Sequence, residues 1–462
     1  MTRQSAALPR LLSSLLLITL AGCMPPRQAP PPEAAVTPPA DWRDEAARSA
    51  EVSATWWRAF DDPQLTALVE AALANNTDVL SAASRVEQAR EQIRLSRAAL
   101  LPAVNASLGA QRTRELSVLG INHTTAIEPS VQVSYEVDLW GRLQRLREAA
   151  DLQYQATEAE RDAVRLAVVS TTARAYISLL SLDEQLEVTR ETVDSRREAL
   201  RVAEDRAKLG YTSQLELSQA QSEYEAAAEL LPQLQQAIRE QENALRLLTG
   251  RLPGAVERGA GLLSIASPPV PGALPSTLLR RRPDIQQAEL LLAASDLNIQ
   301  AQRDRYLPQV QLSASLGRLF VNSLDYDPVR VWDLGASVLA PIFDAGRLEA
   351  GVNIAVAQRN QAAFGYRATA LQAFNEVENS FSAIGNLRQQ LDRVSARRTV
   401  LERSLTYAED RYRAGYSSYL ETLDAQRNLF NTQLATVRLR ESQLNALITL
   451  YQVLGGGWRS EP

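Results

Sequence analysis

The feature that most constrains this 462-residue chain is a run of 68 residues, 142–209, that contains neither glycine nor proline. At about 1.5 Å per residue, a helix of this length extends for roughly 100 Å, far beyond the size of an ordinary domain. Leu179, Leu186 and Val193 recur every seven residues within it, as in a coiled-coil seam. The run therefore predicts a long helix that packs lengthwise against another helix.

The chain contains the same unit twice, at an offset of 205 or 206 residues. The stretch AEDRAKLGYTSQLELSQAQ, which starts at Ala203, returns in closely similar form as AEDRYRAGYSSYLETLDAQ from Ala408. Other matched pairs are residues 101–109 with 307–317, and residues 141–143 with 346–348. A period this long indicates a duplicated unit of domain size and excludes a solenoid of short repeats.

Each unit is expected to begin with a helix of about 35 residues, which ends near Leu100 in the first copy and near Tyr306 in the second. Two segments follow in which apolar and polar residues alternate, the pattern of a strand with unlike faces. The predicted strands cover about residues 102–113, 127–139, 307–319 and 330–341. The connections between the strands of each pair, residues 112–128 and 318–330, are expected to be loops.

A long helical hairpin is expected after each strand pair. It reverses at a glycine, Gly210 in the first copy and Gly415 in the second, because a sharp reversal needs positive φ. The hairpin tips are placed at residues 209–213 and 414–418. The predicted segments are a signal peptide (1–22), an N-terminal tether (23–62), a first repeat (63–251), an irregular linker (252–275) and a second repeat (276–462).

The N-terminus resembles a bacterial lipoprotein signal. Two arginines precede LLSSLLLITLAGC, an apolar run too short to span a bilayer but suited to a secretory signal. The run ends in Leu20-Ala21-Gly22-Cys23, so Cys23 is predicted to become the acylated first residue of the mature chain. The alternative is an ordinary signal peptide with an incidental cysteine. Met24 follows Cys23, and by lipoprotein sorting rules this directs the protein to the outer membrane.

Composition argues against several classes of function. The net charge of −5 and the lack of a basic stripe speak against nucleic-acid binding. One cysteine and one histidine, His123, cannot build a histidine metal site or a disulfide. No phosphate-binding glycine motif is present. We therefore expect no enzyme, no metal and no cofactor apart from a covalent lipid on Cys23.

Four strands per chain set a physical problem. A sheet of four strands cannot close on itself, and an open edge inside a bilayer leaves backbone groups unpaired. The smallest closed membrane barrels need about eight strands. The sheet must therefore be soluble, or several chains must pool their strands.

Five motifs carry a resemblance that extends from about residue 56 to residue 458. They are WWRAFDDPQL from Trp56, RRRPDIQQAE from Arg280, PIFDAGRL from Pro341, LDAQRNLF from Leu423 and LYQVLGGGW from Leu450. Together they closely resemble the TolC/OprM-type outer-membrane factors, in the lipoprotein branch that serves tripartite efflux pumps.

The resemblance implies an α+β membrane protein and a homotrimer. Its strands would form one 12-stranded β-barrel, continued into the periplasm by an α-helical barrel. It implies a passive, gated duct in the outer membrane that carries drugs or other small solutes. Its partners would be a periplasmic adaptor protein, an inner-membrane pump of the proton-driven kind and outer-membrane lipid. The alternatives are a duct for type I protein secretion and a non-conducting coiled-coil lipoprotein that spans the periplasm.

The same resemblance implies a gate at the hairpin tips. Glu421 and Asp424, at i and i+3 on one helix face, match the acidic ring of the family, although spacing alone also fits two solvated carboxylates. Arg411 and Tyr412 match its basic-aromatic lock, and Asp183 (or its neighbour Glu184) is the expected acidic partner. The tip residues that match adaptor-docking segments are Leu209, Gly210, Tyr211, Ala414, Gly415 and Tyr416. The first copy has Gln219 where the second has Asp424, so the second tip is expected to carry the acidic gate.

Overall fold

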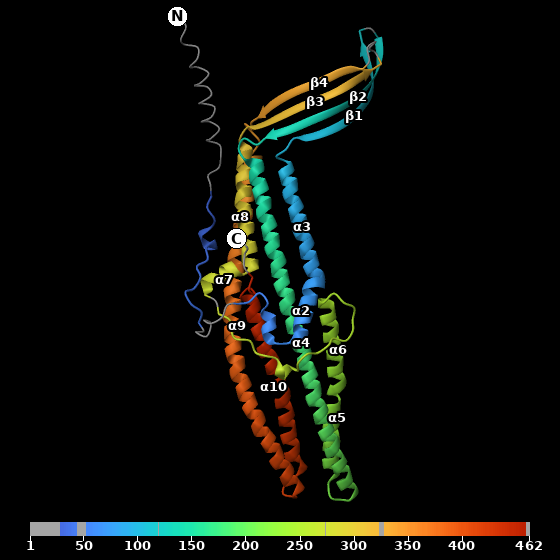
Figure 1. The fold of residues 1–462 in the computed structure, drawn as a ribbon, viewed down its shortest axis with the longest axis vertical. Coiled ribbons are helices and arrows are strands. Elements are labelled where there is room, and N and C mark those ends of the chain that lie inside the picture. The colour runs from blue at the N-terminus through green and yellow to red at the C-terminus, as the bar shows by residue number, and fades with distance from the viewer. Residues whose placement is uncertain (1–27, 44–51, 119, 273, 323–327, 459–462) are drawn as a thin grey trace. The chain divides into compact units, whose positions relative to one another are not determined.

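The computed structural model describes residues 28–43, 52–118, 120–272, 274–322 and 328–458 (Figure 1). Its main elements are α2 (Pro63–Asn75), α3 (Thr77–Ala98), β1 (Ala103–Ser117), β2 (Gly120–Val137), α4 (Arg142–Lys208), α5 (Gln214–Ala228), α6 (Leu230–Leu248), α7 (Pro275–Arg281), α8 (Pro283–Arg303), β3 (Gln309–Val321), β4 (Val329–Leu339), α9 (Arg347–Arg413) and α10 (Tyr419–Val453). Short 3-10 turns lie at Pro32–Ala34, Trp56–Phe60, Leu262–Ser264 and Asp304–Tyr306. Each half of the chain thus runs through helices, a strand pair and a long helical hairpin in the same order.

The chain divides into two compact units. The sheet unit comprises Met1–Ala35, Arg85–Glu158 and Gln287–Ala368. The hairpin unit comprises Val36–Ser84, Ala159–Gln286 and Thr369–Pro462. Both units draw on both repeats, so the duplicated sequence does not fold into two separate domains. Cys23 lies outside the described residues, as does the whole predicted signal peptide.

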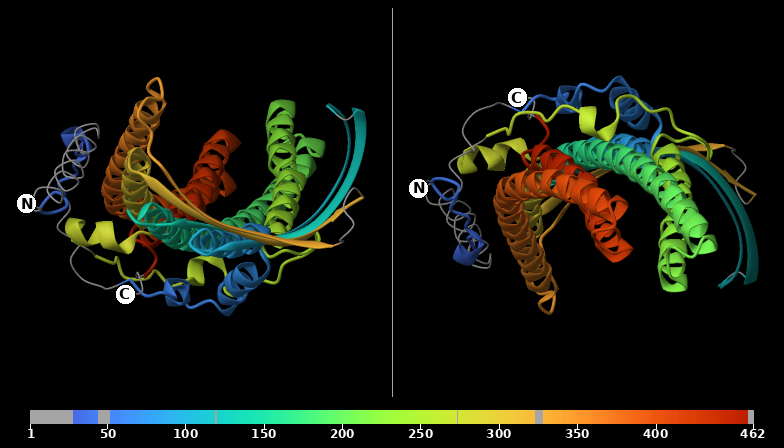
Figure 2. Two further views of the ribbon diagram at one scale, coloured as in Figure 1. Left: turned by 90° about the horizontal axis from the view of Figure 1, so that it is seen from above. Right: turned by 90° about the horizontal axis from the view of Figure 1, so that it is seen from below.

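The sheet unit contains one antiparallel four-stranded sheet, ordered β1-β2-β3-β4 and visibly curved (Figure 2). Its central pair joins the two repeats, because β2 pairs with β3 from Val137↔Val310 to Ala126↔Val321. β1 and β4 lie at the edges, and neither has a second partner strand among the described residues. Both edges therefore present unpaired backbone groups.

The first strand pair is longer than the sequence predicted. β1 and β2 continue to the pair Ser117↔Gly120, so the expected loop over residues 112–128 is wrong. The alternation fades in this stretch because polar residues occupy both faces, yet no residue forces an earlier turn. The chain reverses at Gly120, whose φ of +108° suits glycine. His123 lies in β2, paired with Arg114.

The two long helices match the glycine- and proline-poor runs. α4 and α9 each have 67 residues, and both end two residues before a glycine with φ near +78°. In the hairpin unit, Leu179, Leu186 and Val193 are buried, as the heptad spacing predicts. α9 also contains Gly351, Gly365 and Gly385, and none of them interrupts the helix.

The single helix of about 35 residues expected before each strand pair is wrong. In the first copy it is broken at Asn76, whose side-chain oxygen accepts hydrogen bonds from the backbone N–H of Asp78 (2.9 Å) and Val79 (3.3 Å) and so caps α3. In the second copy it is broken at Arg282, which is extended (φ −107°, ψ 123°) because Pro283 follows it. Both breaks arise from residues that are visible in the sequence.

The returning arms of the two hairpins differ. α10 runs unbroken for 35 residues, whereas the first arm is interrupted between α5 and α6 at Glu229. Pro232 explains the interruption, because its ring clashes with the carbonyl group of residue 228, where α5 ends. The second arm contains no proline.

Candidate functional site at the hairpin tips

The first tip closes on itself. After α4 ends, Gly210 turns the chain at φ +77°, and the Tyr211 N–H donates back to the Arg206 carbonyl group at 2.9 Å. The hydroxyl group of Ser213 then accepts a hydrogen bond from the Glu216 N–H at 3.2 Å and caps α5. The returning helix of this tip is therefore capped by its own residue.

The second tip has the same turn but lacks the same cap. Gly415 has φ +78°, and the Tyr416 N–H donates to the Arg411 carbonyl group at 2.9 Å. Ser418 is the N-cap residue of α10, yet its side chain accepts no capping hydrogen bond in the described structure. Instead, the Tyr419 N–H donates to a carboxylate oxygen of Glu216 at 3.0 Å. A residue of the first tip thus caps the returning helix of the second.

Apolar and aromatic contacts hold the two tips together around this hydrogen bond. Ala203 and Ala220 of the first hairpin form a buried cluster with Tyr419 and Leu423 of the second. Tyr412 packs against this cluster. The guanidinium group of Arg206 lies over the Tyr412 ring, 4.7 Å from the ring centroid. Burial raises the pKa of Tyr419 to about 12. Tyr419 is accordingly only 4% exposed in this contact.

Farther from the tips, a buried ion cluster joins three helices. Glu223 of α5 accepts hydrogen bonds from Arg427 of α10 at 2.8 Å and forms an ion pair with Arg196 of α4 at 3.1 Å. The Arg196 guanidinium also lies over the ring of Phe430, 5.5 Å from its centroid. Glu223 and Arg196 are only 6% and 5% exposed, and burial lowers the pKa of Arg196 despite the nearby carboxylate. The Glu223 carboxylate therefore neutralises the positive charge of Arg196, which is buried between the helices.

The predicted gate residues lie at the second tip, where the sequence placed them. Arg411 and Glu421 approach to 3.7 Å in an exposed pair. Asp424 is exposed, and its carboxylate accepts a hydrogen bond from Asn428 of the same helix at 3.1 Å. Tyr412 is half-buried against Tyr419, with ring centroids 5.5 Å apart. Within one chain these carboxylates have room to face other molecules.

Asp183 is not part of the tip. It precedes the end of α4 by 25 residues, which is roughly 38 Å along a helix. Its carboxylate pairs instead with Arg258 of the linker at 2.9 Å. Burial alone would lower the pKa of Arg258, but the hydrogen bonds to Asp183 and Glu242 outweigh it and raise the pKa. The prediction of Asp183 as tip partner is therefore wrong, and the acidic side chain that contacts the start of α10 is Glu216.

The six residues predicted to dock a partner are all exposed. They are Leu209, Gly210, Tyr211, Ala414, Gly415 and Tyr416. Tyr211 and Tyr416 occupy equivalent places after the turning glycine and are 81% and 80% exposed. Exposed aromatic rings at both tips suit binding of another protein, although their role remains a prediction.

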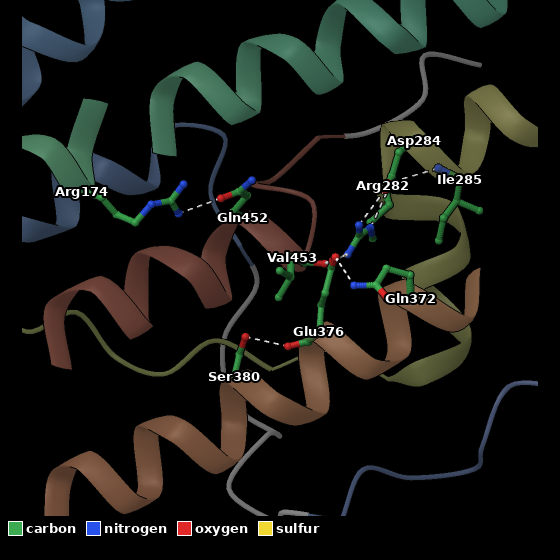
Figure 3. Close-up of polar contacts among 9 residues, drawn as sticks. All are labelled: Arg174, Arg282, Asp284, Ile285, Gln372, Glu376, Ser380, Gln452 and Val453. Carbon is green, nitrogen blue, oxygen red and sulfur yellow. Dashed lines mark hydrogen bonds and ion pairs between the residues drawn. The ribbon is translucent and has the colours of Figure 1, made fainter. Parts of the chain in front are cut away.

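A second polar cluster, at the break between α7 and α8, was not predicted from the sequence (Figure 3). Arg282 donates hydrogen bonds to Glu376 of α9 and to Asp284, both at 2.7 Å, and to the Val453 carbonyl group at the end of α10 at 3.2 Å. Burial opposes the charge of Arg282, but its two carboxylate partners outweigh this and raise its pKa. The signal was present in the motif RRRPDIQQAE, which contains both Arg282 and Asp284. The cluster ties the end of one hairpin to the start of a helix that leads to the sheet.

No group of three or more histidine, cysteine or acidic side chains that could hold a metal ion occurs among the described residues. The tip and its buried supports therefore offer side-chain charges and aromatic rings as their chemistry.

Comparison with known proteins identifies the chain. The sequence model of the outer membrane efflux protein family matches this chain twice, over residues 68–251 and 274–456, once for each repeat. The chain belongs to the outer membrane efflux proteins. The resemblance to TolC/OprM-type factors is thereby confirmed, together with the predicted fold class and the outer-membrane location.

Relatives cover nearly the whole chain. The pyoverdine export outer membrane protein OpmQ of Pseudomonas aeruginosa is 35% identical over 98% of this chain and 97% of its own length. The probable outer membrane lipoprotein SilC of Salmonella typhimurium is 33% identical over 97% of this chain and 99% of its own. The solved structure of the outer-membrane channel OprN matches with a TM-score of 0.85 and 26% identity, covering 94% of this chain and 99% of that one. This efflux protein is accordingly an outer-membrane channel of an efflux system.

Proposed function

We propose that three copies of this efflux protein form one passive duct that leads from the periplasm to the cell exterior. The observation that carries the proposal is the open sheet, whose edge strands β1 and β4 have no second partner among the described residues. An unpaired edge within hydrocarbon leaves each N–H and C=O group without a hydrogen bond. Three four-stranded sheets joined edge to edge give twelve strands, enough for a closed barrel.

The long hairpins supply the periplasmic part of the duct. Helices of 67 residues are roughly 100 Å long and return through α5–α6 and α10, so that three chains contribute twelve antiparallel segments to a helical tube. The exposed tips with Tyr211 and Tyr416 dock a periplasmic adaptor protein, which connects the duct to an inner-membrane pump. The cargo is a small solute, in keeping with the pyoverdine named for OpmQ.

The gate is placed at the second tip. Under threefold symmetry, three copies of Glu421 and of Asp424 approach the channel axis, and their mutual repulsion is relieved by cations or by opening. Arg411 pairs with Glu421 inside each chain, and Tyr412 packs between the hairpins, which keeps the tips closed at rest. Glu216 takes the role of the acidic partner, because it binds the first turn of α10.

Planar-bilayer recordings on the purified full-length protein test the duct and its gate together. Asp424→Ala should give larger or longer openings than the wild type, because it weakens the acidic ring. Gln219→Ala, at the equivalent position of the first tip, is the matched control and should behave like the wild type. If neither the wild type nor Asp424→Ala shows unitary conductance, the protein is a scaffold and the duct is refuted.

A lipid on Cys23 is the second anchor of the protein. The sequence Leu20-Ala21-Gly22-Cys23 supports acylation, as does similarity to SilC, whose name describes a lipoprotein. Cys23→Ala should abolish labelling by radioactive palmitate, while the barrel keeps the protein in the membrane fraction. A fully soluble periplasmic Cys23→Ala protein would contradict the membrane barrel.

A further inference from the structure

A cavity of about 320 Å³ lies in the sheet unit, where the strands meet the helices. Three arginines line it: Arg142 at the start of α4, Arg305 in the turn before β3, and Arg347 at the start of α9. Leu339 and Pro341, at the end of β4, complete much of its wall. Three guanidinium groups around one cavity create a strongly positive site.

The two repeats differ at this place in a way that leaves positive charge unbalanced. Arg142 and Arg347 are equivalent in the repeat, since residues 141–143 match 346–348. Arg142 forms an ion pair with Glu136 at 2.6 Å. The corresponding stretch of the second repeat, residues 341–342, is Pro-Ile and carries no charge. The second repeat therefore keeps the arginine and lacks the carboxylate that neutralises it.

Arg305 adds to this difference. When the two repeats are aligned by matching residue 101 with residue 307, Arg305 corresponds to the uncharged Ala99 of the first repeat. Its neighbour Asp304 is occupied by an ion pair with Arg145. Among the described residues, no side-chain hydrogen bond or ion pair engages Arg305 or Arg347, and both side chains are exposed.

The start of α9 does not supply the missing negative charge. Asp344 accepts hydrogen bonds from the backbone N–H groups of Leu348 at 2.8 Å and Gly346 at 3.2 Å. Its carboxylate is thus committed to capping the helix. The cavity consequently keeps two exposed guanidinium groups without a carboxylate partner beside a third that is paired with Glu136.

The apolar surroundings indicate the kind of ligand. Ile342 and Phe343, directly beside Pro341, are 99% and 89% exposed, and Leu339 is 71% exposed. Such exposure is expected for side chains that face the hydrocarbon of the outer membrane at the end of a spanning strand. Arginines bordering such a surface lie at the level of lipid headgroups, where phosphate groups are concentrated.

We propose that this cavity binds the phosphate group of an anionic lipid headgroup, with Arg305 and Arg347 as its donors. Guanidinium groups bind phosphate oxygens through paired, charge-assisted hydrogen bonds. Arg142 completes the positive wall while remaining paired with Glu136. The site goes beyond the proposed duct, because it would hold a lipid whether or not the channel conducts.

Native mass spectrometry of the purified full-length protein tests the site, with phosphatidylglycerol as the probe and phosphatidylcholine for comparison. The wild type should retain phosphatidylglycerol preferentially. The double variant Arg305→Gln/Arg347→Gln should lose this affinity by roughly 100-fold, about tenfold for each charge-assisted contact removed. Arg347→Lys, which keeps the charge but loses the paired geometry, should fall between the two.

The control is Arg388→Gln, an exposed arginine 41 residues farther along α9, and it should bind phosphatidylglycerol like the wild type. Equal binding by the double variant and the wild type would overturn the site, as would an equal loss in Arg388→Gln. A competition arm with millimolar inorganic phosphate separates the two sources of phosphate. If inorganic phosphate by itself binds the cavity and displaces the lipid, the cavity is a site for soluble phosphate and the lipid assignment is refuted.

Discussion

The two hairpin tips have nearly the same sequence and the same turn, but only the first tip caps its returning helix with one of its own side chains. In the first tip, Ser213 caps the returning helix by accepting the Glu216 N–H. In the second, the equivalent Ser418 caps nothing in the described structure, and the Tyr419 N–H is bound by the side chain of Glu216 instead. One residue, Glu216, thus takes part in both caps: its backbone in its own tip and its carboxylate in the other.

This difference gives the two tips different roles. If the hairpins separate, the first tip loses no helix cap, whereas the first turn of α10 loses the carboxylate that binds it. The second tip also carries Glu421 and Asp424, the proposed acidic gate. In the proposed gate, the moving element would be the one whose local order depends on contact with its neighbour, as expected for a switching segment.

The largest effect is expected from Glu223→Gln, which tests whether the tips are coupled through the buried ion cluster. The variant leaves Arg196 buried without a compensating charge, a change that destabilises by roughly 3 kcal/mol. Hydrogen exchange of α10 amides near Arg427 should become about 100-fold faster. Conductance should rise as the second hairpin loosens.

The matched control for that variant is Glu198→Gln on α4. Glu198 pairs with Arg201 at the surface, where the two side chains are 62% and 60% exposed, so solvent screens the pair and its loss should leave stability nearly unchanged. If Glu223→Gln exchanges no faster than Glu198→Gln, the hairpins are not held together by this cluster.

The sequence predicted the fold where local rules decide it. The run without glycine or proline became α4, the equivalent proline-free stretch became α9, and both hairpins turn at the predicted glycines. Predictions failed where a local signal was overlooked: Pro232 and Asn76 both mark breaks that the structure contains. These errors concern details of length and leave the architecture unchanged.

The candidate site was harder to predict, because it depends on which helix faces lie together. The family resemblance located Glu421 and Asp424, the comparison of the two copies singled out Asp424 against Gln219, and both acidic residues lie in the first turns of α10 at the second tip. The partner of α10 could not be found from spacing, since heptads define a face but not its neighbour. Asp183 and Glu216 were equally acidic in the sequence, and only packing shows that Glu216 is the one in contact.

An intermediate effect is expected at alkaline pH, because the tips differ at the first residue of the returning helix. Burial raises the pKa of Tyr419 from its ordinary value of 10 to about 12, while the first tip has Gln214, which does not titrate. A raised pKa stabilises the fold below pH 10 and loses this contribution as pH rises to about 12. The wild type should therefore lose roughly 2 kcal/mol more than Tyr419→Phe over this interval. Urea unfolding at pH 10 and 12 measures the difference, and parallel losses in both proteins would show that folding does not raise the pKa of Tyr419.

The smallest effect separates the two caps directly. Glu216→Ala removes the carboxylate that binds the Tyr419 N–H but keeps its own backbone N–H for Ser213. The first turn of α10 should lose about 1 kcal/mol, so that the Tyr419 amide exchanges roughly fivefold faster, while α5 is unaffected. Ser213→Ala should do the reverse, loosening the first turn of α5 by a similar amount and sparing α10. An unchanged Tyr419 amide in Glu216→Ala, or a loss at both helices in either variant, would mean that the second tip does not depend on the first for its cap.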